Sequence, residues 1–310
     1  TMLAIEAGYH VLLEKPIAQT WEECLAISEA ARKKGVLVSV CHVLRYHPYF
    51  MKIKELVDSG ELGQIISINH RTSVGVDRTA HGFVRGIWRS ERFANPMLMS
   101  KCCHDIDFLL WLTKTPCRKL TSFGSLRWFK AKNAPEGSAE RCVDCKVEAS
   151  CPFSAIDLYK VRRDWIANFD VPVGKTIDDV IETQLREGLY GRCVYRCDND
   201  VVDNQVVNMV FDNGSTAHQT MTAFSERCYR YIKVHGTKGE VYATMKDKTI
   251  TLYEFETGKK TDVPILDAIT NQEITGGHGG GDRGIMRALT EFLGGTYKGN
   301  ALTDISTSVA

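Results

Sequence analysis

The sequence predicts an α/β domain followed by an α+β domain: the C-terminal half of a Rossmann-type parallel sheet, then an open, mainly antiparallel β-sheet with flanking helices. Two observations predict this order. Apolar runs at residues 9–13 and 36–40 bracket one helical pattern, and a strand–helix–strand unit of this length forms parallel strands with a right-handed crossover. Beyond residue 63 the apolar period becomes two, which is typical of half-buried antiparallel strands.

Size and composition fit a protein of about two domains with a sizeable core. Its 39 basic and 38 acidic residues give no net field that would recruit nucleic acid or an anionic membrane. No apolar run approaches the roughly 20 residues that span a bilayer. The first residues do not form a signal peptide, so we expect a cytoplasmic protein whose 11 cysteines are reduced thiols or metal ligands.

The first domain is predicted to cover residues 1–62. The chain opens in what reads as the last turns of a helix, closed by Gly8, and its end carries no terminating signal, so we expect a fragment. Thr20 and Glu23 form a capping-box pattern for a helix that ends at Gly35. A second amphipathic helix is predicted over residues 49–60.

Charged residues follow both predicted parallel strands. Glu14-Lys15-Pro16 comes directly after the first strand, and Arg45 follows the second. Open parallel sheets bind ligands just outside the carboxyl ends of their strands, so these side chains stand where chemistry is usually done. The alternative interpretation makes Glu14 and Lys15 solvated loop charges and Arg45 an exposed structural arginine.

The second domain is predicted to cover residues 63–310, with a cysteine-rich insertion at about 130–190. A late helix over residues 284–293 is expected to have Asp282 as its N-cap. Turn residues separate the expected strands, which lie at residues 65–74, 120–128, 193–197, 206–211, 215–224, 230–235, 240–244 and 249–255.

Two further segments carry residue types that could serve catalysis or substrate binding. A predicted helix begins near His104, with Asp105 and Asp107 close by, and an unperturbed imidazole pKa of about 6.5 suits a general base at neutral pH. Trp88 and Arg89 share one loop, where an indole and a guanidinium suit the face and edge of a sugar or polyol. The alternatives are a buried, hydrogen-bonded structural histidine and ordinary packing.

In order along the chain, these segments resemble the glucose–fructose oxidoreductase and inositol dehydrogenase family, also called Gfo/Idh/MocA. The resemblance rests on a strand ending in Glu-Lys-Pro, a basic residue after the next strand, a Trp-Arg loop and a helix with His-x-x-Asp. It implies a Rossmann domain, an open sheet domain, and hydride exchange between NAD or NADP and a hydroxyl-bearing carbon of a sugar, polyol or cyclitol. The uncovered sheet face predicts a homo-oligomer.

The resemblance also implies residue roles. Lys15 would lie between the nicotinamide and the substrate hydroxyl, where an ammonium stabilises developing oxyanion character. His104 would take the hydroxyl proton. The expected cofactor-binding set is Glu14, Lys15, Pro16 and Arg45, and the expected substrate-binding set is Trp88, Arg89 and Asp107.

The sequence departs from the family pattern in two ways. Ser100 stands four residues before His104, where relatives often have aspartate, which leaves Asp105 or Asp107 to orient the imidazole. The glycine-rich phosphate turn is missing, and the G-x-G-x-x-G at residues 279–284 follows no buried strand, so we reject it as a dinucleotide site. We therefore expect a fragment without that turn and without the extreme C-terminus, in which NAD and NADP are not distinguished.

A cysteine cluster in the insertion predicts a structural zinc. Cys142, Cys145 and Cys151 lie close together in a segment poor in apolar residues, which a metal would order. Cys193 is the expected fourth ligand, and Cys197 is the alternative. An iron–sulfur cluster or unligated thiols would use the same side chains.

Two rival functions remain. Some relatives use bound NAD for transient oxidation that lets a glycoside be eliminated, so the net reaction is hydrolysis and free sugar forms without net change of the nicotinamide. Alternatively, without the glycine turn, this chain is a catalytically incomplete fragment that binds sugar or mediates oligomerisation.

Overall fold

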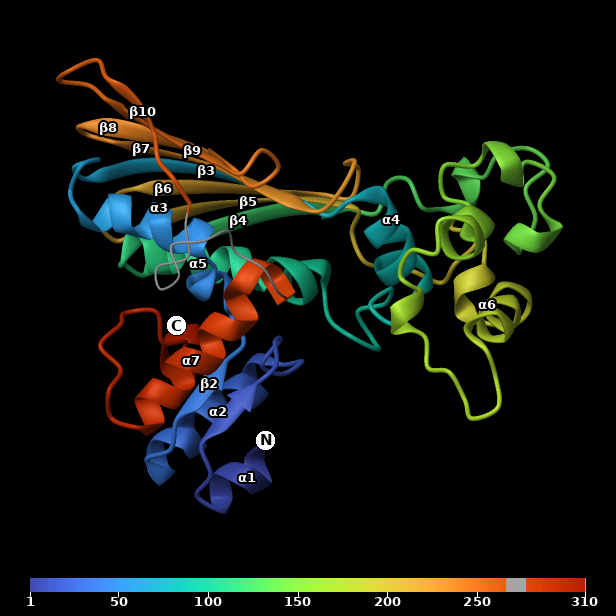
Figure 1. The fold of residues 1–310 in the computed structure, drawn as a ribbon, viewed down its shortest axis with the longest axis horizontal. Coiled ribbons are helices and arrows are strands. Elements are labelled where there is room, and N and C mark those ends of the chain that lie inside the picture. Colours follow the sequence, from blue (N-terminus) through green and yellow to red (C-terminus); the bar gives the residue numbers. More distant parts are fainter. Residues whose placement is uncertain (266–276, 310) are drawn as a thin grey trace.

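The computed structural model describes residues 1–265 and 277–309 and contains a short parallel sheet, a large mixed sheet and helices packed against both (Figure 1). This arrangement confirms the predicted fold class. Within those two ranges, no helix has the length and apolar content needed to cross a membrane.

The βαβ unit forms as predicted. β1 (Val11–Leu13) pairs in parallel with β2 (Val38–Val40), and α2 (Trp21–Lys34) connects them. The Thr20 hydroxyl accepts from the Glu23 amide while the Glu23 carboxylate accepts from the Thr20 amide, so the capping box satisfies two donors at the helix start. Gly35 ends α2 at a φ of 65°, and α1 (Met2–Glu6) packs beside it.

The large sheet has eight strands in the order β10-β9-β8-β7-β3-β6-β5-β4. Its neighbours are antiparallel except for β3 with β6, which run parallel. The strands are β3 (Ile65–Ser73), β4 (Cys117–Ser125), β5 (Asn204–Phe211), β6 (Thr216–Thr222), β7 (Tyr229–Gly236), β8 (Gly239–Thr244), β9 (Thr249–Glu254) and β10 (Lys260–Asp262).

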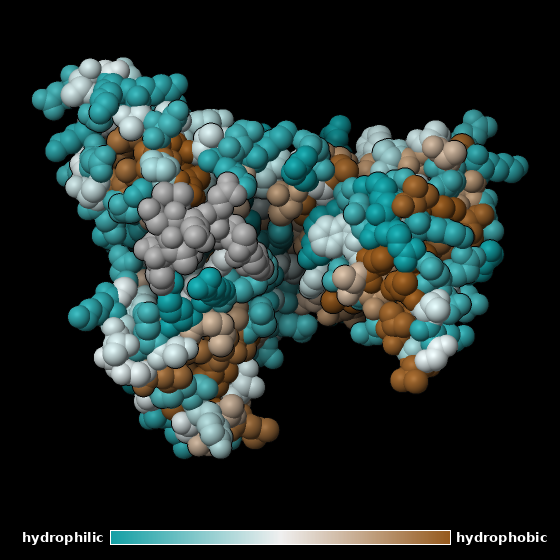
Figure 2. All heavy atoms as spheres, in the orientation of Figure 1, coloured by the Kyte–Doolittle hydropathy of each residue, from teal (hydrophilic) through white to brown (hydrophobic). Residues whose placement is uncertain are grey.

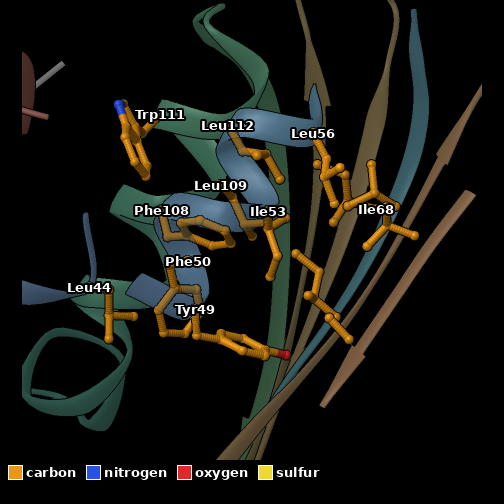
Figure 3. Close-up of a cluster of buried hydrophobic side chains, with 14 of the residues drawn as sticks. Leu44, Tyr49, Phe50, Ile53, Leu56, Ile68, Phe108, Leu109, Trp111 and Leu112 are labelled. Carbon is orange, nitrogen blue, oxygen red and sulfur yellow. The ribbon is translucent and has the colours of Figure 1, made fainter. Parts of the chain in front are cut away.

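The main core lies between this sheet and two helices, α3 (Pro48–Asp58) and α5 (Cys103–Thr113), which cover one of its faces (Figures 1 and 3). Phe50 and Phe108 meet edge-on with their ring centroids 4.7 Å apart. Ile68 of β3 is fully buried beneath them. Each such side chain contributes roughly 1.5–3 kcal/mol on burial, so the sheet holds both helices firmly.

The C-terminal segment returns to the βαβ unit. α7 (Gly281–Leu293) packs on the turn η1 (Val43–Tyr46), where a Cβ at Gly284 would lie 2.7 Å from that of Tyr46, and Ile305 of α8 (Ile305–Ser308) is buried beside β2. Asp282 was predicted as the N-cap of this helix, and that was wrong. Gly280 is the N-cap, and the Asp282 carboxylate bonds His278 instead. The boundaries 1–62 and 63–310 stay a prediction.

The insertion forms a separate lobe between β4 and β5, built around α6 (Ile177–Arg186) (Figure 1). A strand was predicted at residues 193–197, and that was wrong. The chain turns there, because the Cys193 carbonyl accepts from the Arg196 amide, and only Arg192 makes a bridge, to Arg141. Beneath the sheet, the surface is notched between this lobe and the βαβ unit (Figure 2).

Short helical turns make up the remaining regular structure. They are α4 (Val76–Arg78), η2 (Thr79–Arg85), η3 (Leu98–Cys102), η4 (Ala131–Asn133), η5 (Cys142–Asp144), η6 (Glu148–Ser150), η7 (Asp157–Val161), η8 (Ile166–Asn168), η9 (Leu189–Gly191) and η10 (Gly277–Gly280).

Candidate active site

A buried ion-pair network fixes the start of α5 to the large sheet. The fully buried Asp105 accepts from Arg230 of β7, with Nε–Oδ1 at 2.6 Å and Nη2–Oδ2 at 3.3 Å, and its Oδ1 lies 2.7 Å from Nε2 of His70 on β3. Burial raises the pKa of Asp105, but Arg230 and His70 outweigh burial and hold it well below its usual range. The carboxylate therefore stays ionised and α5 stays attached to the sheet.

A second buried pair fixes the same helix to the βαβ unit. Arg45 in η1 donates from Nε and Nη2 to the two carboxylate oxygens of Asp107, at 2.8 and 2.6 Å. Each residue is only 5% exposed. Arg45 was predicted to bind the cofactor and Asp107 the substrate. In the structure each side chain binds the other, so the pair positions α5, and direct contacts with ligands stay predictions.

His104 on the first turn of α5 differs from Asp105 and Asp107, because the described residues offer its imidazole no hydrogen-bond partner. Neither of its ring nitrogens makes a hydrogen bond within the described part of the chain, and Nδ1 is fully buried. The ring of His42, which follows β2, meets it edge-on with centroids 5.8 Å apart. The structure thus gives no support to the interpretation of His104 as a hydrogen-bonded structural histidine.

The surroundings of His104 keep it neutral. Burial lowers its pKa well below 6.5, and the positive charges of Lys15 and Arg230 lower the pKa further. Asp105 raises the pKa but does not outweigh them. A neutral imidazole has a free lone pair, so His104 is ready to accept a proton at neutral pH.

Lys15 reaches the same corner from the carboxyl end of β1. Its ammonium donates to the backbone carbonyl of Ser100 at 2.9 Å, immediately before α5. The Ser100 hydroxyl donates to the Asn95 carbonyl and therefore does not replace a relay carboxylate. Glu14 is exposed beside Lys15, and Pro16 is half-buried. The structure brings the two predicted catalytic residues, Lys15 and His104, to one corner, which we call the catalytic corner.

The loop with Trp88 and Arg89 follows η2 and contacts the insertion. Arg89 donates from Nε and Nη2 to the Asp198 carboxylate at 2.8 and 3.1 Å. The Arg78 guanidinium lies 4.8 Å from the centre of the Trp88 ring. Both predicted substrate-binding side chains are therefore held in place by contacts within the protein, and their role toward a substrate stays a prediction.

The four predicted metal ligands line one small cavity of about 20 Å³ in the insertion. They are Cys142, Cys145, Cys151 and Cys193. Cys197 lines a different, open cavity, and its thiol donates to the Cys193 carbonyl at 3.2 Å. Among the residues that the structure describes, His42, Cys103 and His104 are the one set of three possible ligands whose ligand atoms all lie within 4.8 Å of one another, so the four cysteines are spaced more widely than that.

Sequence reasoning missed the partners that hold this corner together. His70 and Arg230 lie on β3 and β7 at positions where the alternation points toward the core, between apolar neighbours such as Ile68 and Ile232. A charged side chain at an inward strand position needs a buried partner, and that signal was available. His42 follows a buried strand and carries no comparable signal in the sequence.

Two family models match the chain. The C-terminal alpha/beta domain of the Gfo/Idh/MocA oxidoreductase family matches residues 54–306. The NAD-binding Rossmann fold of the same family matches residues 1–42. Together they cover both sheets.

Relatives with names and structures agree with these matches. YteT of Bacillus subtilis (strain 168), named as an oxidoreductase, is 24% identical over 306 residues, which are 92% of this chain and 66% of that protein. The scyllo-inositol 2-dehydrogenase (NADP(+)) IolW of the same organism is 46% identical over 65 residues, 21% of this chain and 18% of that protein. Levoglucosan dehydrogenase, in complex with NADH and L-sorbose, shares the fold with a TM-score of 0.68 at 17% identity, over 99% of this chain and 69% of that one. The chain thus spans just under two thirds of the length of YteT.

Proposed function

Because this chain belongs to the Gfo/Idh/MocA oxidoreductase family, we propose that it exchanges a hydride between NAD or NADP and a hydroxyl-bearing carbon of a sugar, polyol or cyclitol. The observation that supports this proposal most is that the Lys15 ammonium, bonded to the Ser100 carbonyl, lies near enough to act on His104, a neutral imidazole without a hydrogen-bond partner in the described structure, at the carboxyl end of a parallel sheet. The relatives named as inositol and levoglucosan dehydrogenases support the substrate class.

The ends of β1 and β2 fit the nicotinamide part of such a cofactor. Glu14, Lys15 and Pro16 follow β1, and His42 after β2 has a buried Nδ1 with no hydrogen-bond partner in the described structure, which suits a polar ligand group. The segment between β1 and α2 contains no glycine-rich turn for a pyrophosphate. When bound, the nicotinamide supplies the acceptor for hydride in oxidation and the donor in reduction.

His104 acts as the general base of the proposed reaction. Burial seals Nδ1, so Nε2 is the nitrogen left to face a substrate. In oxidation, the substrate O–H proton moves to His104, the carbon–oxygen double bond forms, and the electron pair of the C–H bond leaves as hydride. Reduction returns the proton from His104 to the oxygen. Such a positioned base contributes typically 10²–10⁴-fold in rate.

Lys15 stabilises the oxygen during this transfer. One N–H of its ammonium is bonded to the Ser100 carbonyl, and this contact aims the side chain at α5. Its other N–H groups can donate to the substrate oxygen as negative charge develops there. A donor preorganised in this way is worth about 10²–10³ in rate.

Further assignments complete the proposal. Trp88 and Arg89 contact the substrate from the edge of the insertion. In the insertion, a structural zinc is held by Cys142, Cys145, Cys151 and Cys193.

The outer face of the large sheet, where Phe123 is 71% exposed, joins two copies of the chain. The structure describes all 11 cysteines and pairs none of them in a disulfide, which fits a reducing cytoplasm.

The test uses the full-length protein that contains this chain. We expect nicotinamide reduction with at least one member of a panel of sugars, polyols and cyclitols, offered with NAD and with NADP. Lys15→Ala and His104→Asn should each lower kcat/KM by about 10²-fold or more. Lys33→Ala is the matched control, because Lys33 is exposed on α2 and, among the described residues, forms its ion pair with Glu29.

Unchanged melting temperatures would show that both variants fold. Near-normal turnover in either one would refute its assigned role. Release of free sugar with no net change in nicotinamide absorbance would favour the hydrolase rival instead.

A further inference from the structure

Arg85 is a buried cation without a carboxylate partner. It ends η2 and is 0% exposed. Its Nε donates to the Arg192 carbonyl at 2.7 Å and its Nη2 to the Phe153 carbonyl at 2.6 Å, while Nη1 is buried and has no hydrogen-bond partner among the described residues. Within residues 1–265 and 277–309, no carboxylate forms an ion pair with it. A buried charge without a counter-charge is destabilising, so this site favours an anion.

Arg85 contacts each of the loops that carry the cysteines. Its Nη2 lies 3.6 Å from Sγ of Cys142. Phe153 follows Cys151 by two positions, and Arg192 directly precedes Cys193. One guanidinium therefore binds all three segments from which these cysteines come.

The cysteines themselves are arranged around one space. Cys142, Cys145, Cys151 and Cys193 line the cavity together with Arg85 and with Glu148, whose carboxylate accepts from the Ser154 hydroxyl and makes no ion pair with Arg85 in the described structure. The cavity volume of about 20 Å³ holds roughly one water-sized particle. The Ala155 amide donates to Sγ of Cys142 at 3.4 Å, a contact that stabilises negative charge on sulfur. In the structure the sulfur atoms surround the space loosely, so they would move inward to reach Zn–S distances of about 2.3 Å.

We propose that these four cysteines bind one zinc ion as thiolates and that Arg85 is the counter-charge of the site. On binding, the four thiols release their protons to solvent, and the resulting tetrathiolate carries a net charge of two minus. That anion is the missing partner of Arg85. The inference deepens the structural zinc of the proposed function and does not depend on hydride transfer.

Charge and geometry select this site over its alternatives. Cys197 faces a different cavity, so Cys193 is the fourth ligand. The trio of His42, Cys103 and His104 offers one thiolate, and a divalent ion there would leave net positive charge beside Lys15. Room for a single ion also favours zinc over an iron–sulfur cluster.

The site has a consequence for the substrate loop. Arg192, next to Cys193, donates to the Arg85 carbonyl at 3.4 Å and to the Asp198 carboxylate at 2.6 Å, and Asp198 also holds Arg89. Zinc therefore fixes the insertion against the loop with Trp88 and Arg89. Loss of zinc should raise KM more than it lowers kcat.

The first experiment measures metal in the purified full-length protein. We expect close to one zinc per chain in the unmutated protein and in Cys197→Ser, the matched control, and almost none in Cys193→Ser. Cobalt substitution should give sulfur-to-cobalt charge-transfer bands in the first two proteins only. Zinc kept by Cys193→Ser, zinc lost from Cys197→Ser, iron with acid-labile sulfide, or no zinc uptake by the unmutated protein would each overturn the site.

The second experiment tests the counter-charge. Arg85→Met should lower zinc affinity by about tenfold or more in competition with a chromophoric chelator, and Arg85→Lys should restore part of it. Circular dichroism checks the fold, and if Arg85→Met does not fold, Arg85→Lys alone must show weakened but measurable zinc binding. Equal affinity in the folded variants and the unmutated protein would overturn the role of Arg85. Neither experiment involves substrate, so failure of the proposed reaction would not affect the result.

Discussion

The catalytic corner and the cysteine-rich insertion both bury arginines, but they compensate the charge in opposite ways. In the corner, Arg45 is paired with Asp107 and Arg230 with Asp105. Against the insertion, Arg85 of η2 donates to two carbonyl groups and a thiol, and within the described residues it makes no ion pair with a carboxylate. The buried arginines of the corner are neutralised as the chain folds, whereas Arg85 would be neutralised only when an anionic group forms beside it.

This difference shows how each region uses its polar residues. In the corner, the two ion pairs hold α5 rigidly, and the imidazoles of His104 and His42 keep ring nitrogens that have no hydrogen-bond partner among the described residues. In the insertion, the unpaired group is a cation, and its partner would be a metal–thiolate centre with a structural role. An unpaired buried group thus indicates a reaction site in one region and a ligand site in the other.

The largest effect should come from breaking the corner's inner pair. Asp105→Ala leaves Arg230 buried without its carboxylate, so we expect a loss of about 3–5 kcal/mol in the free energy of unfolding. Urea denaturation measures it. The double variant Asp105→Ala/Arg230→Leu removes both charges and should recover part of the loss. A single variant within about 1 kcal/mol of the unmutated protein would show that the corner does not depend on this pair.

Zinc should stabilise the insertion and leave the corner unchanged. Free zinc at about 1,000 times its Kd should add about 4 kcal/mol to the stability of the segment that binds it. Hydrogen exchange by mass spectrometry should show protection across residues 130–200 on zinc addition and none in α5. Equal protection of both regions on zinc addition would show that zinc also stabilises the corner, and it would contradict the separate stabilisation of the two regions.

The outer pair of the corner should matter less for stability than for activity. Asp107→Asn keeps the shape of the side chain but removes the charge that Arg45 binds, at a cost of about 1.5–3 kcal/mol. Because this pair positions α5, kcat should fall while zinc content stays the same. A variant with normal kcat would show that His104 does not rely on Arg45 for its position.

Lowering the pH should reduce the stability of both regions, because a buried histidine lies near each of them. Burial lowers the pKa of His47 near the corner and of His81, which lies in η2 and packs against the insertion, to about 4, below the 6.5 of the unfolded chain. The unfolded state therefore takes up protons first, so stability is lost as pH falls from 6.5 towards 4. Each histidine contributes up to about 1.4 kcal/mol per pH unit in that window. Urea unfolding at several pH values checks this, and a flat profile from pH 7 to 5 would contradict it.

The fold was largely predictable from the sequence because it depends on local patterns. Three features have local causes and form as expected: the capping box at Thr20 and Glu23, the end of that helix at Gly35, and the change of apolar period after residue 63. The two errors were also local. A cysteine-flanked run at residues 193–197 turns instead of pairing, and Asp282 bonds a side chain instead of capping α7.

The site was predictable only in part, since its partners come from distant segments. Lys15 and His104 were found from their place after a strand and at a helix start. Arg45 pairs with Asp107, and Asp105 pairs with Arg230, which lies 125 positions later in the chain. Both pairings depend on how the sheet and the helices pack. Period-two patterns place Arg230 on the core face but do not say which carboxylate it meets.

Hydride transfer at the corner is tested most directly with a substrate deuterated on its hydroxyl-bearing carbon. In the full-length protein, we predict that deuterium appears on the reduced nicotinamide as fast as substrate is consumed, and that His104→Asn slows both together by about 10²-fold or more. Mass spectrometry of the nicotinamide follows the label. Substrate consumption with no deuterium on the nicotinamide, or with the label returned to a free sugar product, would contradict the assignment.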